Sequence, residues 1–251
     1  MIKSDDMRRD EGRRSLKIRW QIMTIEALRT LKQFYTYRDL SSALKIPEAL
    51  LCRYVTGDVA PSMERAMEIA LKLHETGLIE KMIERKLEID EMGVVNIYPL
   101  AYDSRILKLA AYHAFTEFSG SNVNAVLTAA VNGIPLATMV SSILDAKLAV
   151  AKKNRDPSTK SYLEIQYLTL SPPTLTSLYL PSTILKPGDN VLIVDDLLQS
   201  GRTLHALSKL AEQAGGRIIG VYALLALGDA WRASVPETID KIVIAKHVRL
   251  G

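Results

Sequence analysis

The segment Val191–Thr203 constrains the fold of this chain more than any other stretch. It reads Val-Leu-Ile-Val-Asp-Asp-Leu-Leu-Gln-Ser-Gly-Arg-Thr, so a short apolar strand ends in Asp195 and Asp196. A small polar loop, Gln199–Thr203, then leads into a helix that starts near Arg202. Free N–H groups and the dipole at a helix N-terminus favour an anion such as a phosphate. Because carboxylates accept hydrogen bonds from hydroxyls, the segment indicates a site for a ribose 5-phosphate group.

This segment resembles the phosphoribosyl-pyrophosphate (PRPP) signature of type I phosphoribosyltransferases. The resemblance implies that the two acids hold the ribose hydroxyls, directly or through a metal ion such as Mg²⁺, and that the loop wraps the 5-phosphate. Arg202 stands where many family members have a second glycine, and we expect the loop to tolerate it. The alternative is an ordinary strand–turn–helix that binds no ligand. The residue string is specific enough to favour the ligand site over this alternative. The predicted ligand residues are Asp195, Asp196, Leu197, Leu198, Gln199, Ser200, Gly201, Arg202 and Thr203.

Two upstream segments fit the same α/β fold with a parallel sheet. Asn124–Val131 is an apolar strand, Asn132-Gly133 is a tight turn, and Ile134–Leu144 predicts a helix with Pro135 in its first turn. The resemblance implies a pyrophosphate-binding loop at Asn132 and Gly133. We expect the next strand at Lys147–Ala151. It ends in two cations that either meet the pyrophosphate or form a solvated basic turn: Lys152 and Lys153.

Residues 154–182 resemble the mobile flap of the same family. The segment Asn154–Lys160 has polar turn chemistry, and Leu163–Leu170 and Leu178–Leu180 predict an extended hairpin around Ser171–Pro173. No Lys-Gly-His catalytic pattern like that of orotate enzymes occurs in this segment. This weakens the case for catalysis, and we assign no catalytic residue.

A second group of signals lies near the N-terminus. Thr36 and Asp39 form a capping box for a short helix, Asp39–Leu44, and Lys45-Ile46 is a turn. Pro47 suits the first position of a helix that runs to Thr56, which the following glycine ends. Another helix is expected from Pro61-Ser62, with an inward stripe of Met63, Ala66, Met67, Ala70 and Leu73.

These helices resemble the helix-turn-helix of Cro/repressor-like regulators. The residues that carry the resemblance are Leu40, Ile46, Leu51, Arg53, Tyr54, Gly57 and Pro61. The resemblance implies binding of double-stranded DNA, whereas the alternative is a helical bundle used for dimerisation. The predicted DNA-binding residues are Glu48, Ala49 and Leu50, with Pro47, Arg53, Tyr54 and Thr56. Glu48, Ala49 and Leu50 are expected at the start of the helix in the major groove. The other four are expected to contact phosphates, pack or cap.

The charge distribution supports a nucleic-acid partner for the N-terminal part. Residues 1–86 hold 17 Lys and Arg against 13 Asp and Glu, whereas residues 87–251 hold 15 of each. Residues 1–20 hold seven basic side chains, including Arg8, Arg9, Arg13 and Arg14. This segment is either an arm that reaches phosphates or the minor groove, or a solvated tail or the start of the first helix. A net charge of +4 alone does not establish DNA binding.

The length suits two domains joined by a helix. We predict a helix-turn-helix domain at 1–76, a linker helix within 77–94 (Leu78–Met92) and a phosphoribosyltransferase-like domain at 95–251. The last includes an amphipathic helix, Tyr102–Phe118, and a final strand, Lys241–Ala245. No run of 18 apolar residues and no signal-peptide core occurs, so we expect no membrane span.

A single cysteine, Cys52, excludes an internal disulfide and suits a reducing cytoplasm. The four histidines, His74, His113, His205 and His247, show no metal-ligand spacing. Trp231 follows a strand that ends near Leu227. It is a candidate for stacking on an effector base or, equally, for the core.

Together these signals resemble phosphoribosyltransferase-like transcriptional regulators, which include the purine repressors of some bacteria and helix-turn-helix forms of archaea. The resemblance implies a homodimer that reads a pseudo-palindromic operator and senses PRPP or a nucleotide. The first competing hypothesis is an active purine or orotate phosphoribosyltransferase with an added helical domain. The second is an RNA-binding attenuator-type protein. The operator, the effector base and the sign of regulation are not encoded in any recognisable pattern.

Overall fold

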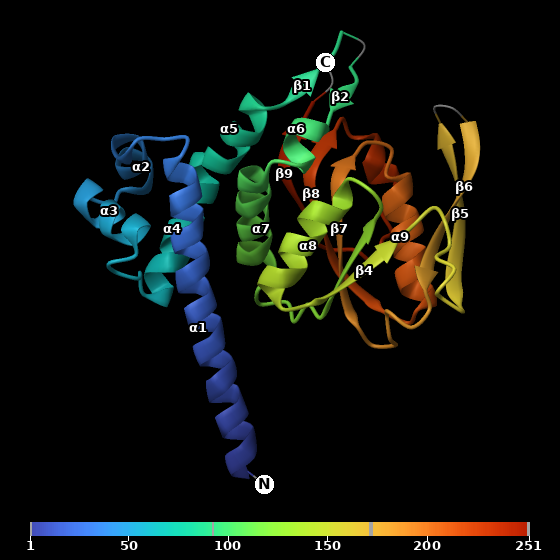
Figure 1. Cartoon of the computed structure of the whole chain (residues 1–251), viewed down its shortest axis with the longest axis horizontal. Helices are drawn as coiled ribbons and strands as arrows, with labels where there is room; N and C mark the ends of the chain where they lie inside the picture. Colours follow the sequence, from blue (N-terminus) through green and yellow to red (C-terminus); the bar gives the residue numbers. More distant parts are fainter. Residues whose placement is uncertain (1, 92, 171–172, 250–251) are drawn as a thin grey trace. The chain divides into compact units, whose positions relative to one another are not determined.

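The computed structural model describes residues 2–91, 93–170 and 173–249, and the chain forms two compact units, Met1–Met82 and Ile83–Gly251. The first unit is helical (Figure 1), and its last helix, α5 (Leu78–Arg85), begins in this unit and ends in the second one. Within the described residues, no helix has the length and apolar character needed to span a membrane. The helices of this part of the chain are α1 (Ile2–Lys32), α2 (Tyr37–Leu44), α3 (Glu48–Thr56), α4 (Met63–Thr76) and α5 (Leu78–Arg85).

The N-terminal segment is the beginning of a long helix, since the backbone of α1 is helical from Ile2. The side chains of Arg8, Arg9 and Arg13, part of the predicted basic arm, lie outside the described residues. Further along, α1 contacts α3 and α4, and Trp20, Leu28 and Leu31 are buried there. A role of this helix in DNA binding stays a prediction.

The capping box and the turn between α2 and α3 form as predicted. The Thr36 hydroxyl accepts a hydrogen bond from the Asp39 amide, and the Thr36 amide donates to the Asp39 carboxylate. Lys45 takes the left-handed conformation, with φ of 56°, and Gly57 ends α3 with φ of 88°. Pro47 precedes the first residue of α3 and does not occupy the first turn.

The buried face of α4 differs from the predicted stripe. Met67 is 44% exposed, whereas Ile69 is fully buried between Ala66 and Leu73. The buried positions 66, 69, 70 and 73 follow the i, i+3, i+4, i+7 spacing, but positions 63, 66, 67 and 70 of the predicted stripe follow it as well, so the spacing alone does not select the buried face.

The predicted linker helix Leu78–Met92 is wrong beyond Arg85. A short antiparallel pair follows α5, formed by β1 (Glu88–Ile89) and β2 (Val95–Asn96). The Asp90 carboxylate and carbonyl accept from the Val94 and Gly93 amides, and Gly93 has φ of 78°. A turn built on aspartate and a positive-φ glycine outweighs the helical spacing of the apolar residues. Met92 lies outside the described residues.

The second unit contains a five-stranded parallel sheet in the order β4-β3-β7-β8-β9. Leu127 and Ile193 share one core with α9, and the alternate residues Val126 and Leu192 are buried on the other face, which α8 contacts. Figure 1 shows these helices along the sheet. The strands are β3 (Ala125–Ala129), β4 (Lys147–Ala151), β7 (Asn190–Leu198), β8 (Arg217–Leu227) and β9 (Ile242–Val248), and the helices are α6 (Tyr98–Ala101), α7 (Ser104–Phe118), α8 (Gly133–Leu144), α9 (Arg202–Gln213) and the 3-10 helix η1 (Ala230–Ser234).

Three predicted elements of this unit form with small shifts of their ends. The helix α7 begins at Ser104 because Asp103 caps its N-terminus, so Tyr102 precedes it. The last strand, β9, starts one residue later than predicted and lies at the edge of the sheet. The flap is an antiparallel hairpin of β5 (Tyr162–Leu170) and β6 (Pro173–Pro181), whose second strand is longer than predicted because it already begins at Pro173 and not at Leu178. Residues 171 and 172 at its tip lie outside the described residues.

Candidate functional site

The paired acids lie inside a strand and not at its end. The strand β7 continues through Leu198, where it pairs with Ala226 of β8, so the loop before α9 is only Gln199–Gly201. Asp195 is 5% exposed, and Leu198 is 1% exposed within the core. The Leu198 side chain therefore packs inward, and the predicted ligand role for this residue can involve only its backbone.

Burial raises the pKa of both carboxyl groups. The pKa of Asp195 lies well above its ordinary value, first because of burial and then because of the neighbouring Asp196 charge. Burial likewise raises the pKa of Asp196, although the Asp195 side chain and nearby backbone groups lower it. The Asp196 amide donates to Asp195 Oδ1 over 3.1 Å. A pair of buried acids with so little compensation is suited to hydroxyl donors or a cation from a ligand.

The predicted pyrophosphate loop lies against this acid pair. A Cβ atom on Gly133 would lie 2.5 Å from Thr128 Oγ1, 3.4 Å from Asp195 Oδ1 and 3.7 Å from Asp196 Oδ1. Only glycine leaves this space open. Thr128 is fully buried, and in the part of the chain that the structure describes its hydroxyl is the one buried side-chain polar atom without a hydrogen-bond partner.

Thr128 lies beside Gly133 and the acid pair, and it was not among the residues predicted from the sequence. The available signal was a single hydroxyl within the apolar strand Ala125–Ala129. A buried polar atom without a partner is costly, so a polar ligand atom at this position would be stabilised. Carboxylate and hydroxyl oxygens also suit Mg²⁺, so the donor set fits both a sugar diol and a divalent cation.

The loop Gln199–Gly201 is shaped by close packing on η1. Gly201 has φ of 71°, and a Cβ atom there would lie 2.6 Å from the Trp231 carbonyl oxygen and 2.7 Å from Ser234 Cβ. The Ser234 hydroxyl donates to the Ser200 carbonyl over 2.9 Å. Helix α9 begins without a side-chain cap, which leaves the amides of its first turn, including Thr203, available to an anion.

Trp231 is a core residue, and its predicted role in base stacking is wrong. The side chain is 1% exposed, and Nε1 donates to the Gly228 carbonyl over 2.9 Å. A ring enclosed by protein on both faces cannot receive a base. Its backbone instead supports Gly201.

Arg202 connects the loop to the flap. Its guanidinium donates to the Leu168 carbonyl of β5. A cavity of about 370 Å³ lies beside this contact, lined by Tyr167, Leu168, Arg202, His205, Ala233 and Ser234. The residue that replaces a family glycine thus links two parts of the unit.

The remaining residues of the predicted pyrophosphate site lie at neighbouring strand ends. Asn132 Oδ1 accepts a hydrogen bond from the Tyr102 hydroxyl over 2.9 Å. Lys152 and Lys153 are exposed after β4, which pairs with β3. The Lys152 backbone also pairs with Tyr179 of the flap through two hydrogen bonds. Whether the lysines meet a pyrophosphate stays a prediction.

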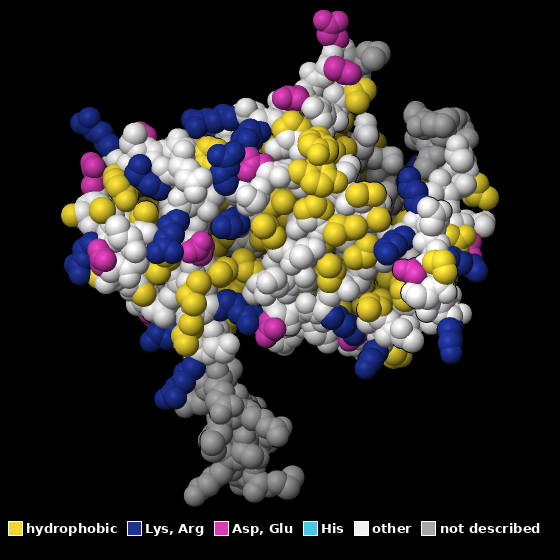
Figure 2. Space-filling model, viewed as in Figure 1, with side chains coloured by type: hydrophobic (Ala, Val, Ile, Leu, Met, Phe, Trp, Pro, Cys, Tyr) yellow, Lys and Arg dark blue, Asp and Glu magenta, His cyan; other side chains and the backbone are white. Residues whose placement is uncertain are grey.

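In the helical unit, α3 presents a polar outer face. Glu48, Ala49 and Arg53 are exposed, and Leu50 is half-buried. Tyr54 is 5% exposed, so it packs in the core and is not available to phosphates. Figure 2 shows Lys and Arg side chains spread over the visible surface of this unit among acidic ones.

The C-terminal end of α3 is held by side chains of the same unit. Arg29 Nε donates to the Val55 carbonyl over 2.6 Å, and Nη2 donates to the Thr56 carbonyl over 3.2 Å. The Thr56 hydroxyl bonds to the Cys52 carbonyl and to Asp58. Thr56 therefore stabilises the helix end locally, and the guanidinium of Arg29 was not singled out by any sequence pattern.

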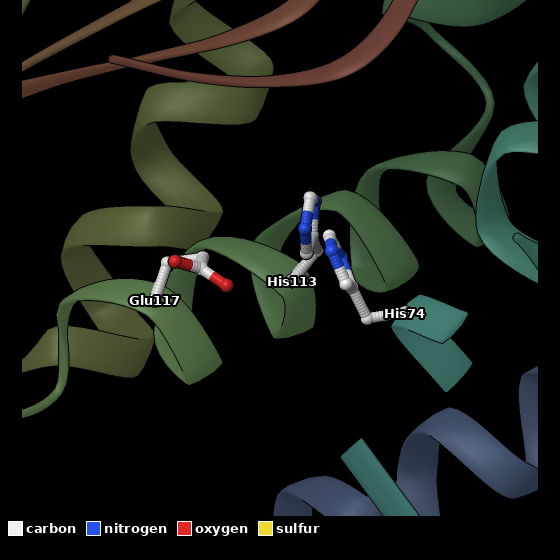
Figure 3. A group of neighbouring side chains, drawn as sticks. All are labelled: His74, His113 and Glu117. Carbon is white, nitrogen blue, oxygen red and sulfur yellow. The ribbon is translucent and has the colours of Figure 1, made fainter. Parts of the chain in front are cut away.

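The histidine of α7 has a structural partner. His113 Nδ1 lies 3.3 Å from the hydroxyl of Tyr222 in β8, and burial raises the pKa of Tyr222 well above its ordinary value. Figure 3 shows His113 and Glu117 one helical turn apart; His74, drawn with them, belongs to α4 of the other unit. His113 thus helps to join α7 to the sheet.

A parallel sheet with a pair of acids in the last part of one strand, followed by an anion-type loop at the start of a helix, is typical of α/β proteins that handle phosphorylated ligands. The family of the phosphoribosyl transferase domain matches residues 101–250, and the chain belongs to this family. Adenine phosphoribosyltransferase from Rhodothermus marinus DSM 4252 has the same fold, with a TM-score of 0.60 and 20% identity, over 68% of this chain and 98% of that protein.

Curated relatives include both regulators and enzymes. The purine biosynthesis transcriptional repressor PurR of Bacillus subtilis (strain 168) is 28% identical over 122 residues, which cover 49% of this chain and 41% of that protein. The probable purine biosynthesis transcriptional regulator PurR of Streptococcus pneumoniae (serotype 4) is 26% identical over 57% of this chain and 54% of that protein. The chain thus spans about half the length of these regulators.

The enzyme relatives are equally similar in identity. The hypoxanthine/guanine phosphoribosyltransferase of Methanococcus voltae is 29% identical over 164 residues, which cover 60% of this chain and 83% of that protein. Similarity alone therefore does not separate a regulator from an enzyme.

Proposed function

We propose that this protein is a transcriptional regulator that binds double-stranded DNA and senses PRPP or a nucleotide. The observation that carries the proposal is the union of two features in one chain. The helical unit has two short helices, α2 and α3, joined by a left-handed turn at Lys45. The other unit belongs to the phosphoribosyl transferase domain family. Relatives named as purine biosynthesis regulators support this combination.

On the DNA side, α2 and α3 act as a helix-turn-helix, with α3 in the major groove. Glu48 and Ala49 lie at the N-terminal end of α3, where base contacts concentrate in this motif. Arg53 is exposed one turn further on and contacts a phosphate. A two-fold dimer then reads a pseudo-palindromic site.

On the ligand side, the acid pair takes the ribose hydroxyls and the loop before α9 takes the 5-phosphate. Asp195 and Asp196 accept from the sugar, and the Thr128 hydroxyl gains a polar partner. Bound Mg²⁺ would supply positive charge that offsets the two acids. The short loop at Gly201 brings backbone amides to the phosphate.

The two activities are coupled, and a ligand changes DNA affinity only if it prefers one state of the protein. The chain connection between the units runs through α5. We expect saturating PRPP or nucleotide to change operator affinity by roughly 5–150-fold, the usual span of allosteric coupling. By linkage, operator DNA changes ligand affinity by the same factor.

The test is a selection of bound sequences from genomic DNA, with and without PRPP, followed by titration of the enriched site. Enrichment of a pseudo-palindrome and an affinity that depends on PRPP are the expected results. A parallel titration with single-stranded RNA of the same sequence separates this function from an RNA attenuator. Failure to enrich any DNA would contradict the proposal.

The second candidate function is an active phosphoribosyltransferase. It is favoured by the similarity to the Methanococcus voltae enzyme, of which the matched segment covers 83%. The measurement is PRPP-dependent consumption of hypoxanthine with release of pyrophosphate. Steady turnover, together with DNA affinity that is identical with and without PRPP, would place the protein among the enzymes.

A further inference from the structure

Two stacked tyrosines lie on the surface of the phosphoribosyl transferase unit. The ring centroids of Tyr98 and Tyr102 are 4.6 Å apart, and the ring planes differ by 29°. Tyr98 is 68% exposed and Tyr102 is 42% exposed. Figure 2 shows apolar side chains gathered over α6, the helix that begins with Tyr98. Two large rings left in contact with water are typical of a binding surface.

A chain of contacts connects this tyrosine pair to the acid pair. The Tyr102 hydroxyl donates to Asn132 Oδ1 over 2.9 Å. The next residue is Gly133, whose missing Cβ position lies 3.4 Å from Asp195 Oδ1 and 3.7 Å from Asp196 Oδ1. Tyr102 thus reaches the loop beside the acid pair, and Tyr98 stacks on Tyr102, although both tyrosines precede the acids by more than 90 residues.

The sheet order places the tyrosine pair and the phosphate loop on opposite sides of the acids. The loop at Gly201 packs on η1, which follows β8, whereas Asn132 and Gly133 follow β3. Because β7 lies between β3 and β8, the acids of β7 lie between these two contacts. In a nucleoside 5′-monophosphate the ribose separates the phosphate from the base. Such a ligand would span the edge of the sheet with its base toward β3.

We infer that Tyr98 and Tyr102 form the stacking surface for the base of a nucleoside 5′-monophosphate held at the acid pair. The inference rests on the ligand site proposed above and adds the recognition of the base. The exposed face of Tyr98 receives the base, and the hydrogen bond from Tyr102 to Asn132 fixes the pair against the loop. Stacking accepts every base because each has a π face, so this surface provides affinity more than selectivity among bases.

The test measures binding to the full chain by calorimetry. The probes are adenosine, guanosine, cytidine and uridine 5′-monophosphates, with ribose 5-phosphate as the probe that lacks a base. Tyr98→Ala is expected to weaken the best-bound nucleotide roughly tenfold, because a base stacked on an aromatic ring contributes a factor of this order. The affinity for ribose 5-phosphate should not change, and Tyr98→Phe should retain nucleotide affinity because it keeps the ring.

Each other outcome has a distinct meaning. An equal loss for nucleotide and ribose 5-phosphate in Tyr98→Ala would overturn the inference, because the tyrosine would then only support the loop. Unchanged nucleotide affinity would also overturn it. If that result came with a change of oligomeric state in sedimentation, the tyrosines would instead belong to an interface between copies. If the wild-type protein binds neither class of probe, the proposed ligand site fails and this inference fails with it.

Discussion

The acid pair of β7 and the outer face of α3 hold their functional residues in opposite ways. Asp195 is 5% exposed, its carboxyl pKa is raised, and glycines at positions 133 and 201 leave no room for a Cβ atom. On α3, Glu48, Ala49 and Arg53 are exposed, and the helix is fixed from behind by Leu51 and Tyr54.

The difference shows how each kind of site is built. A small polar ligand is recognised by buried groups that the fold leaves incompletely paired, so the site carries a cost in stability. A nucleic-acid surface needs exposed side chains on a rigid support, so recognition and stability are separate there. Substitutions in the first region should change stability and binding together, whereas outward residues of α3 should change binding alone.

The largest expected effect is on ligand binding at the acid pair. We expect Asp195→Asn with Asp196→Asn to weaken PRPP or nucleotide binding at least about tenfold, since each charged hydrogen bond contributes roughly 1.5–3 kcal/mol. Calorimetry measures the affinity. Unchanged affinity would contradict the assignment of the acids to the ribose.

The same double variant has a predicted pH signature in the ligand-free protein. Because burial raises the folded-state pKa of both acids, their contribution to stability is present at low pH and is lost as pH rises above about 4, the ordinary carboxyl pKa. The wild-type protein should therefore lose more free energy of unfolding between pH 4 and 7 than the double variant. Denaturant titrations at both pH values provide the comparison.

The second effect is steric and contrasts two positive-φ glycines. Gly201→Ala should lower the free energy of unfolding by roughly 2–4 kcal/mol, because left-handed strain adds to a clash with the Trp231 backbone. Gly57→Ala at the end of α3 should cost only about 1 kcal/mol, since its Cβ would meet the flexible guanidinium of Arg29. Denaturant unfolding measures both variants. Equal losses would remove the contrast between the regions.

The third effect concerns DNA and tests whether the α3 surface is independent of stability. Glu48→Ala should alter sequence preference, with a change of roughly 1–3 kcal/mol at one base position. Arg53→Ala should weaken binding to all sequences and flatten the dependence on salt. Arg65→Ala on α4, within the same unit, is the control outside α3. Gel-shift titrations at several salt concentrations measure these changes, and melting temperatures should stay near that of the wild type.

The smallest effect is expected at Asp103, which lies in the same unit as the acid pair. The pKa of its carboxyl group is lowered, whereas the pKa values of Asp195 and Asp196 are raised. Asp103 lies 2.6 Å from Lys86 Nζ and 2.8 Å from Arg105 Nη2. The hydrogen bonds from Arg105 are the main cause of a pKa well below the usual carboxyl range. Its stabilisation is thus present above the ordinary pKa of about 4 and is lost as pH falls through the lowered value.

Asp103→Asn keeps the helix cap and removes the charge. It should lower the free energy of unfolding by roughly 1–2 kcal/mol at pH 7, and the difference from the wild type should shrink below about pH 4. Asp103→Ala removes the cap as well and should cost about 1 kcal/mol more. A difference that does not change between pH 7 and low pH would show that the ion pairs contribute nothing to stability.

Much of the fold could be predicted because its signals are local. The capping box of Thr36 and Asp39, the turn that precedes α8 and the alternation of strands and helices around β3, β4 and β7 depend on residues close in the chain. The stripe of α4 and the end of α5 were wrong where two local signals competed. At Gly93, a positive φ decided for a turn against an apolar spacing that suits a helix.

The candidate site likewise combines features that are local in the sequence with features that depend on tertiary contacts. The sequence by itself determined that Asp195, Asp196 and Gly201 lie beside a helix N-terminus, because a strand, a loop and a helix follow one another directly there. Only the tertiary structure decided that Trp231 and Tyr54 are buried, that Thr128 has an unpaired hydroxyl beside Gly133, and that Tyr102 reaches Asn132. The physical reason is that burial and cross-chain contacts depend on which strands pair and which helices cover them. No residue spacing along the chain records those distances.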